Sequence, residues 1–280
     1  MRQPILFLVK GGSGSRMIAE FLEKCGVYMG WRGNLNSSYD SLLFTHNFQR
    51  RLLLPRFKYG SGCVYGNKSP IRRTGRNCIQ KHLKKYEGGR WGFKTCDAMF
   101  SFPLYNTIFP NAKYIQLVRD SRDVILSKEG RHNLCHADPN VRKRYWEYFK
   151  IITFGLSNDM RKFKFFMDDY RVYDILFKYR FFIQAKACVE HLIQLKQLRN
   201  EGLISKDNSI VVKYEDFCLD SKKQGQRLCE FLGIKFSDEA IKFCEEDIHT
   251  ESVKKWEKRS GLENVHEFLS SHNLKYLFYE

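Results

Sequence analysis

An arginine and a serine eight residues apart are the side chains in this sequence best suited to holding a phosphate. Arg119 ends the apolar segment 114–118, and Ser127 follows after a stretch that predicts one or two turns of helix. A guanidinium at the end of a strand can bind a phosphate through two charge-assisted hydrogen bonds, and a hydroxyl adds a neutral one. The alternative is a buried strand followed by a surface helix with solvated charges. The motif alone leaves both interpretations open.

A glycine-rich segment near the start of the chain predicts a second anion site. The apolar run 4–9 is typical of a buried parallel strand, and residues 17–22 have helical periodicity. Between them lie Gly11, Gly12, Ser13, Gly14, Ser15 and Arg16. Such a turn exposes backbone N–H groups at the positive end of a helix dipole. The segment is not a Walker A loop, because no lysine followed by serine or threonine ends it, and an ordinary turn is the alternative.

These two elements, in this order and about a hundred residues apart, resemble sulfotransferases that use 3′-phosphoadenosine 5′-phosphosulfate (PAPS). The resemblance is closest to bacterial sulfotransferase-like proteins. It implies that residues 12–16 cradle the 5′-phosphosulfate, that Arg119 and Ser127 bind the 3′-phosphate, and that no metal is required. One position departs from the family, because Gly12 stands where many members carry a basic residue. Lys10 and Arg16 are the two candidates for the replacement charge.

Three later segments extend the resemblance over most of the chain: 91–95, which contains Lys94; 210–217, which contains Tyr214; and 253–259, which contains Trp256 and Arg259. A helix end at Phe231-Leu232-Gly233 also matches, with Gly233 suited to the position after the last helical turn. The resemblance places Lys94 beside the transferring sulfuryl group and Tyr214 on the adenine side. It also implies that Trp256, with Lys255 and Arg259, closes over the nucleotide.

The general base that deprotonates the acceptor is the least defined part of this chemistry. Asp40 lies in a polar segment, 33–41, that resembles one in bacterial sulfotransferase-like proteins, and we take it as the leading candidate. His46 and His132 are the other candidates. Asparagine and aspartate clusters are also common as turns and helix caps, so a structural role for Asp40 remains open.

The elements that must position these residues predict an α/β protein. Helical stretches separate four apolar segments that read as strands, at about 4–10, 90–94, 113–118 and 209–214. This alternation predicts a P-loop-like three-layer fold with a central, mostly parallel sheet flanked by helices. Ligands of such sheets bind at the carboxyl ends of the strands, where both phosphate sites would lie.

The organisation reads as a single sulfotransferase domain over 1–280, with a helical, aromatic-rich insertion at about 140–200. Aromatic residues crowd together from 163 to 182, among four basic residues. A helical subdomain with an aromatic core and a wall that binds the acceptor both fit this composition. The acceptor itself is not readable, beyond a hydroxyl or amine with a carbohydrate or another anionic molecule favoured.

The charge balance favours anionic partners. Lys and Arg number 48 against 31 Asp and Glu, a formal net charge of +17. PAPS is anionic, and so are nucleic acids, but we find no zinc-finger spacing, RNA-recognition signature or basic heptad region. A P-loop kinase-like phosphotransferase and a non-catalytic anion- or nucleic-acid-binding module remain the rival functions. The kinase would need a lysine followed by serine or threonine in its loop.

Cysteine usage and the N-terminus bear on the compartment. Nine cysteines are scattered without a C-x-x-C pair, which argues against a structural zinc site and favours reduced thiols. The first apolar run is too short for a signal anchor or a membrane-spanning helix. We therefore expect a cytoplasmic protein without a membrane span. The alternative is a luminal enzyme whose anchor is missing from this sequence.

Overall fold

The computed structural model describes residues 3–31, 39–41, 43–44, 68–96, 98–127, 180–260 and 263–271. The chain forms two compact units. The first unit consists of Met1–Arg119 and Ile193–Val253, and the second of Asp120–Leu192 and Lys254–Glu280. The expectation of one domain over 1–280 stays a prediction.

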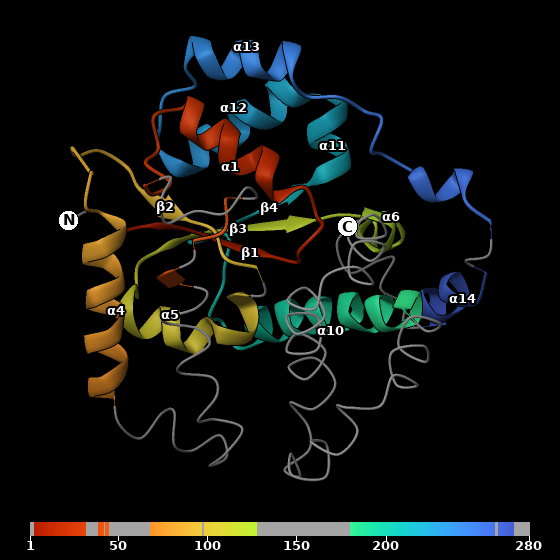
Figure 1. Cartoon of the computed structure of the whole chain (residues 1–280), viewed down its shortest axis with the longest axis horizontal. Coiled ribbons are helices and arrows are strands. Elements are labelled where there is room, and N and C mark those ends of the chain that lie inside the picture. The colour runs from red at the N-terminus through yellow and green to blue at the C-terminus, as the bar shows by residue number, and fades with distance from the viewer. Residues whose placement is uncertain are drawn as a thin grey trace, which may run out of the picture. The chain divides into compact units, whose positions relative to one another are not determined.

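A four-stranded parallel sheet forms the centre of the first unit (Figure 1). Its order is β2-β1-β3-β4, with β1 at Ile5–Val9, β2 at Gly92–Phe93, β3 at Lys113–Val118 and β4 at Ser209–Lys213. All three neighbouring pairs are parallel, with Val9 opposite Leu117 and Val118 opposite Lys213. The four strands expected from the sequence are confirmed. Because the strands are parallel, the residues that follow β1, β3 and β4 meet at one edge of the sheet.

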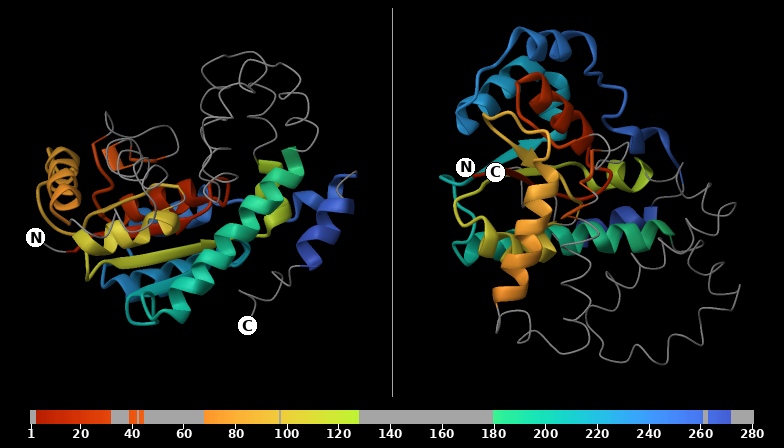
Figure 2. Two further views of the ribbon diagram at one scale, coloured as in Figure 1. Left: turned by 90° about the horizontal axis from the view of Figure 1, so that it is seen from below. Right: turned by 60° about the vertical axis from the view of Figure 1, so that its left-hand side comes forward.

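Helices cover both faces of this sheet, which confirms the three-layer α/β fold (Figures 1 and 2). One face carries α1 (Ser15–Lys24), α11 (Tyr214–Leu219), α12 (Ser221–Leu232) and α13 (Asp238–Glu246). The other carries α5 (Phe102–Ile108) and the part of α10 (Arg180–Asn200) that belongs to this unit. The helix α4 (Lys68–His82) and the 3₁₀ helix η3 (Ala98–Ser101) complete the unit. Strands β1 and β3 are buried on both faces, which explains their continuous apolar sequences.

The ends of several helices follow from their sequences. Asp220 caps α12 by accepting a hydrogen bond from the backbone N–H of Lys223, and Ser237 caps α13 by accepting one from Ala240. Helix α12 ends at Gly233 in the left-handed conformation, with φ 63°, as the sequence predicts.

In the second unit, α6 (Ser121–Ser127) lies against the 3₁₀ helix η5 (Lys255–Lys258) and α14 (Glu263–Ser271). Of the expected insertion at about 140–200, residues 140–179 lie outside the described residues, and 180–200 form α10. Among the helices that the structure describes, none is both long and apolar enough to cross a membrane.

Candidate functional site

The glycine-rich segment forms a tight turn between β1 and α1. Gly12 and Gly14 both have positive φ, 96° and 86°, which glycine adopts without strain. Ser13 closes the turn, since its backbone N–H and its hydroxyl both donate to the carbonyl of Lys10, at 3.1 and 2.7 Å. Gly14 is the N-cap of α1, and its carbonyl accepts from Met17. Helix α1 therefore begins immediately after the turn.

The first turn of α1 provides the donors that an anion would need. The N–H groups of Ser15 and Arg16 precede the first intrahelical hydrogen bond, and they lie at the positive end of the helix dipole. Ser15 is buried, whereas the Arg16 side chain is exposed. Lys10, the other candidate for the loop's basic residue, is almost fully buried. Of the two residues that could supply the loop's positive charge, Lys10 and Arg16, only Arg16 has an exposed side chain.

Tyr214 packs directly on this loop. It is the first residue of α11, immediately after β4. A Cβ atom placed on Gly14 would lie 2.2 Å from two carbons of the Tyr214 ring, so a larger residue at position 14 would have to displace that ring. Burial raises the pKa of Tyr214 to about 12, and the phenol is neutral at physiological pH.

Arg119 follows β3 and reaches the same loop. Its guanidinium carbon lies 4.2 Å from the centre of the Tyr214 ring, in cation–π contact. One terminal nitrogen donates to the carbonyl of Gly12 at 3.2 Å, and the other donates to the carbonyl of Ser252. The structure thus brings four predicted site residues together at the carboxyl edge of the sheet: Gly12, Gly14, Arg119 and Tyr214. We call these four residues the anion-loop cluster.

Ser127, the expected partner of Arg119, lies at the end of α6 in the second unit. Its hydroxyl donates to the carbonyl of Val124 at 2.8 Å, within its own helix. The pairing of Ser127 with Arg119 around one phosphate stays a prediction.

The two residues expected to be catalytic form an ion pair. Lys94 directly follows β2, and its ammonium donates to Oδ1 of Asp40 at 2.8 Å. The side chain of Lys94 is only 1% exposed, against 16% for Asp40. The backbones also meet, since the N–H of Ser41 donates to the carbonyl of Lys94 at 2.7 Å. A buried ammonium needs such a partner, and Asp40 therefore holds Lys94 in place.

Cys96 adds a third contact, which sequence reasoning missed. Its thiol donates to the same Asp40 oxygen at 3.3 Å. The two other candidates for the general base, His46 and His132, lie outside the described residues.

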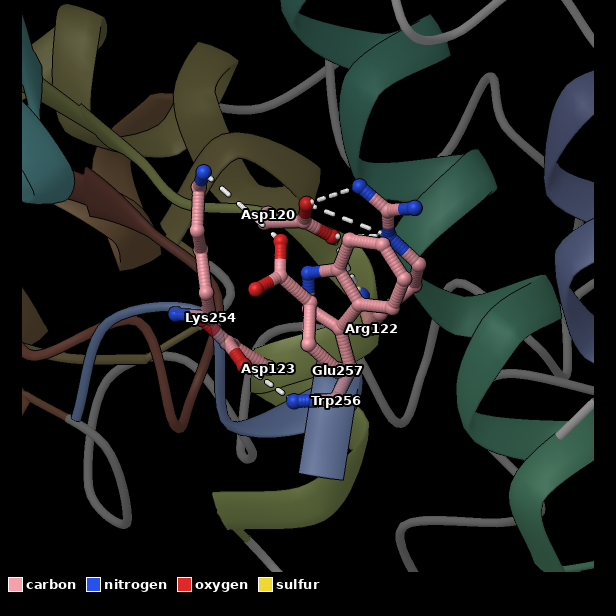
Figure 3. Close-up of polar contacts among 6 residues, drawn as sticks. All are labelled: Asp120, Arg122, Asp123, Lys254, Trp256 and Glu257. Atoms are coloured by element: carbon pink, nitrogen blue, oxygen red, sulfur yellow. Dashed lines mark hydrogen bonds and ion pairs between the residues drawn. The ribbon is translucent and has the colours of Figure 1, made fainter. Parts of the chain in front are cut away.

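In the second unit, a buried carboxylate fixes the backbone around Trp256 (Figure 3). Asp123 on α6 is fully buried and accepts hydrogen bonds from the backbone N–H groups of Lys254, at 2.7 Å, and Trp256, at 3.2 Å. Sequence reasoning missed Asp123. The available signal was an acidic residue directly before the apolar run 124–126. Arg259 is exposed, and its backbone N–H donates to the carbonyl of Trp256.

The Trp256 side chain is held by rings and charges. The guanidinium carbon of Arg122 lies 3.4 Å from the centre of the Trp256 ring, while Asp120 accepts hydrogen bonds from the same guanidinium (Figure 3). The His266 ring of α14 meets the indole edge-on at 5.2 Å between centres. Burial lowers the pKa of His266, which keeps this ring neutral at physiological pH. Trp256 therefore packs as part of the second unit, and its expected role over a nucleotide stays a prediction.

Among the side chains that the structure describes, no group of three or more His, Cys, Asp or Glu residues is placed to hold a metal ion. The expectation that no metal is required stays a prediction.

A family model described as a sulfotransferase domain matches residues 101–274, well over half of the chain. No curated protein sequence matches.

Similar solved structures include the sulfotransferase domain of an olefin synthase from Synechococcus PCC 7002, at 15% identity and a TM-score of 0.52, covering 97% of this chain and 95% of that one. A sulfotransferase from Alicyclobacillus acidocaldarius gives 12% identity and a TM-score of 0.52, covering 97% and 93%. A sulfotransferase from Mycobacterium avium has 12% identity and a TM-score of 0.53, covering 98% of this chain and 77% of that one. At these identities the likeness concerns the fold.

Proposed function

This chain belongs to the sulfotransferase family, and from that premise we propose that it transfers a sulfuryl group from PAPS to a hydroxyl or amine of an acceptor. The observation that carries the proposal is the anion-loop cluster, Gly12, Gly14, Arg119 and Tyr214, at the start of α1. It combines helix N–H donors with a fixed guanidinium. The N–H donors suit the 5′-phosphosulfate, and the guanidinium suits the 3′-phosphate.

In this proposal the nucleotide is held from two sides. The loop 12–16 and the N-terminus of α1 bind the 5′ side, while Arg119 and Ser127 bind the 3′-phosphate. Tyr214 supports Arg119 through the cation–π contact and packs next to the adenine side. Trp256 and Arg259 close over the bound nucleotide.

The transfer itself moves one sulfuryl group. The acceptor oxygen or nitrogen attacks sulfur in line, the bond from sulfur to the bridging oxygen breaks, and adenosine 3′,5′-bisphosphate leaves. Lys94 neutralises the charge that grows on the bridging oxygen, since a lysine is a mobile point charge. Asp40 takes the acceptor's proton as Lys94 turns from the carboxylate towards that oxygen. The Lys94–Asp40 ion pair supports this exchange because one movement would supply the charge and release the base.

For the acceptor we propose a carbohydrate. The support is the surplus of 17 positive charges over the whole chain, which favours acidic glycans among the molecules that carry free hydroxyls.

The experiment is a transfer assay with radiolabelled PAPS against a panel of glycans and small hydroxyl and amine acceptors. With the acceptor found, we compare the parent with Lys94→Ala, and use Lys206→Ala, at an exposed loop lysine, as the matched control. We expect Lys94→Ala to lower kcat by about a hundredfold with little change in the affinity for PAPS. The control should match the parent. Absence of transfer to every acceptor, or a parental kcat in Lys94→Ala, would contradict the proposal.

A further inference from the structure

Two helices of the first unit, α1 and α12, pack side by side through matched positions one turn apart. Phe21 and Cys25 are four residues apart at the end of α1, and the N–H of Cys25 still donates to the carbonyl of Phe21. Gly225 and Cys229 are four residues apart on α12. Residues four apart lie on the same face of a helix. Helix α1 therefore presents Phe21 and the thiol of Cys25 to α12. Helix α12 presents Gly225 and the thiol of Cys229 to α1.

Gly225 sets the distance between the helices. A Cβ atom placed there would lie 3.0 Å from two carbons of the Phe21 ring, so the ring rests on the bare backbone of α12. One turn further along both helices, this close approach places the sulfur atoms of Cys25 and Cys229 3.6 Å apart. A disulfide bond is about 2.04 Å long, so the two sulfurs need to approach by about 1.6 Å. The helix packing thus holds two thiols nearly at bonding distance, although they are 204 residues apart in sequence.

The two thiols differ in access. Cys25 is partly exposed, whereas Cys229 is only 1% exposed. The hydrogen bond between them raises the pKa of Cys25 and lowers that of Cys229, because the shared proton stabilises one thiolate. The thiol of Cys244 on α13 donates instead to the carbonyl of Ser221 at 3.7 Å.

We propose that Cys25 and Cys229 are a redox modification site that forms a reversible disulfide by exchange with a small disulfide of the glutathione class. Cys229, whose thiolate the shared hydrogen bond stabilises, takes the proton of the partly exposed Cys25 as Cys25 attacks one sulfur of glutathione disulfide, and the first glutathione leaves as a thiolate. Cys229 then attacks the Cys25 sulfur of the mixed disulfide, and the second glutathione leaves with the proton of Cys229. Two protein thiols are oxidised, and one glutathione disulfide is reduced to two glutathiones.

The bond would tie two elements that support the anion loop. Gly14 and Cys25 are the N-cap and C-cap of α1, and α12 belongs to the segment that follows β4 through Tyr214. Because the bond closes a loop of about two hundred residues, it restricts the unfolded chain strongly. We expect oxidation to raise the melting temperature by about 5–10 °C. The proposal does not depend on the function proposed above.

The test uses the full chain in a series of glutathione and glutathione disulfide buffers, followed by rapid alkylation and peptide mass spectrometry. We expect a peptide pair joined through Cys25 and Cys229, two hydrogens lighter than the reduced pair. The melting temperature should rise with it and return to the reduced value after dithiothreitol. Cys25→Ser and Cys229→Ser should each abolish both the joined peptides and the rise in melting temperature. Cys78→Ala, at a buried thiol elsewhere, should retain both.

Gly225→Val provides an independent check of the geometry, since it would push Phe21 and α12 apart and require a more oxidising buffer for the same disulfide fraction. Three outcomes would overturn the proposal: a bond from Cys229 to Cys244, a stable glutathione adduct on Cys25 without closure, or an unchanged melting temperature on oxidation of the parent.

Discussion

Gly14 offers the sharpest structural test of the anion loop, because Gly26 supplies a matched control at the other end of α1. Both glycines have similar positive φ, 86° for Gly14 and 80° for Gly26. The positive φ therefore costs alanine a similar amount at either position. A Cβ atom at Gly26 meets nothing within 4 Å, whereas one at Gly14 meets the Tyr214 ring at 2.2 Å. The difference between the two variants therefore isolates the contact with Tyr214.

The expected losses of stability follow from two costs, that of a left-handed backbone and that of displacing the Tyr214 ring. A left-handed backbone costs an alanine about 1–2 kcal/mol, and Gly26→Ala should lose that much free energy of unfolding. At Gly14 the ring must also move by about 1.3 Å to reach ordinary carbon contact at about 3.5 Å. Overpacking of this kind costs about 1–3 kcal/mol more. Gly14→Ala should therefore lose about 2–5 kcal/mol in total.

Chemical denaturation of both variants, and of each in a Tyr214→Ala background, measures the contact directly. Removing the ring should abolish the excess cost of Gly14→Ala and leave the cost of Gly26→Ala unchanged. Because Arg119 rests on the same ring, Gly14→Ala should also weaken the binding of adenosine 3′,5′-bisphosphate, and Gly26→Ala should not. Equal losses of stability in the two single variants, or an excess loss that persists without the ring, would show that contact with Tyr214 is not what requires glycine at position 14.

Three further predictions concern other residues. Burial lowers the pKa of His82 from its usual 6.5 to about 4, so below pH 6.5 the unfolded chain binds a proton that the folded chain excludes. The free energy of unfolding should therefore fall by up to about 3 kcal/mol as the pH drops from 6.5 to 4. Denaturation of His82→Phe over the same pH range should show a smaller fall. Asp123→Ala should speed hydrogen exchange at the two backbone amides that it binds, whereas Glu257→Ala, in an exposed ion pair, should not; equal rates in both variants would contradict this. Calorimetry should show a loss in binding adenosine 3′,5′-bisphosphate of about 1.5–3 kcal/mol for Arg119→Ala and about 0.5–1.5 kcal/mol for Ser127→Ala, and a reversed order would count against their proposed roles.

The fold was largely predictable from sequence because each strand is a short apolar run between turn and helix signals. The segment 113–118 matches β3 residue for residue, and Gly233 ends α12 as expected. The order of the strands was not predictable. The order depends on which strands pair across the sheet, and the local sequence of a strand does not determine its partner.

The contacts among the expected site residues could not be predicted from the sequence. The sequence indicated Lys94 and Asp40 separately, and their ion pair emerges only when β2 and residue 40 meet. Asp123 was missed because an aspartate in a charged segment looks like a solvated one until its burial is known. The approach of Cys25 to Cys229 depends on how α1 packs on α12, which no local pattern encodes.

The most direct test of the central claim is calorimetric titration of the full chain with adenosine 3′,5′-bisphosphate, and separately with ATP and Mg²⁺. The glycine-rich loop does not end in the lysine followed by serine or threonine of a Walker A loop, and Arg119 reaches it from the end of β3. We expect saturable binding of the bisphosphate at one site, and much weaker binding of ATP with or without the metal. Equal or tighter binding of ATP with Mg²⁺, or no binding of the bisphosphate, would contradict this expectation.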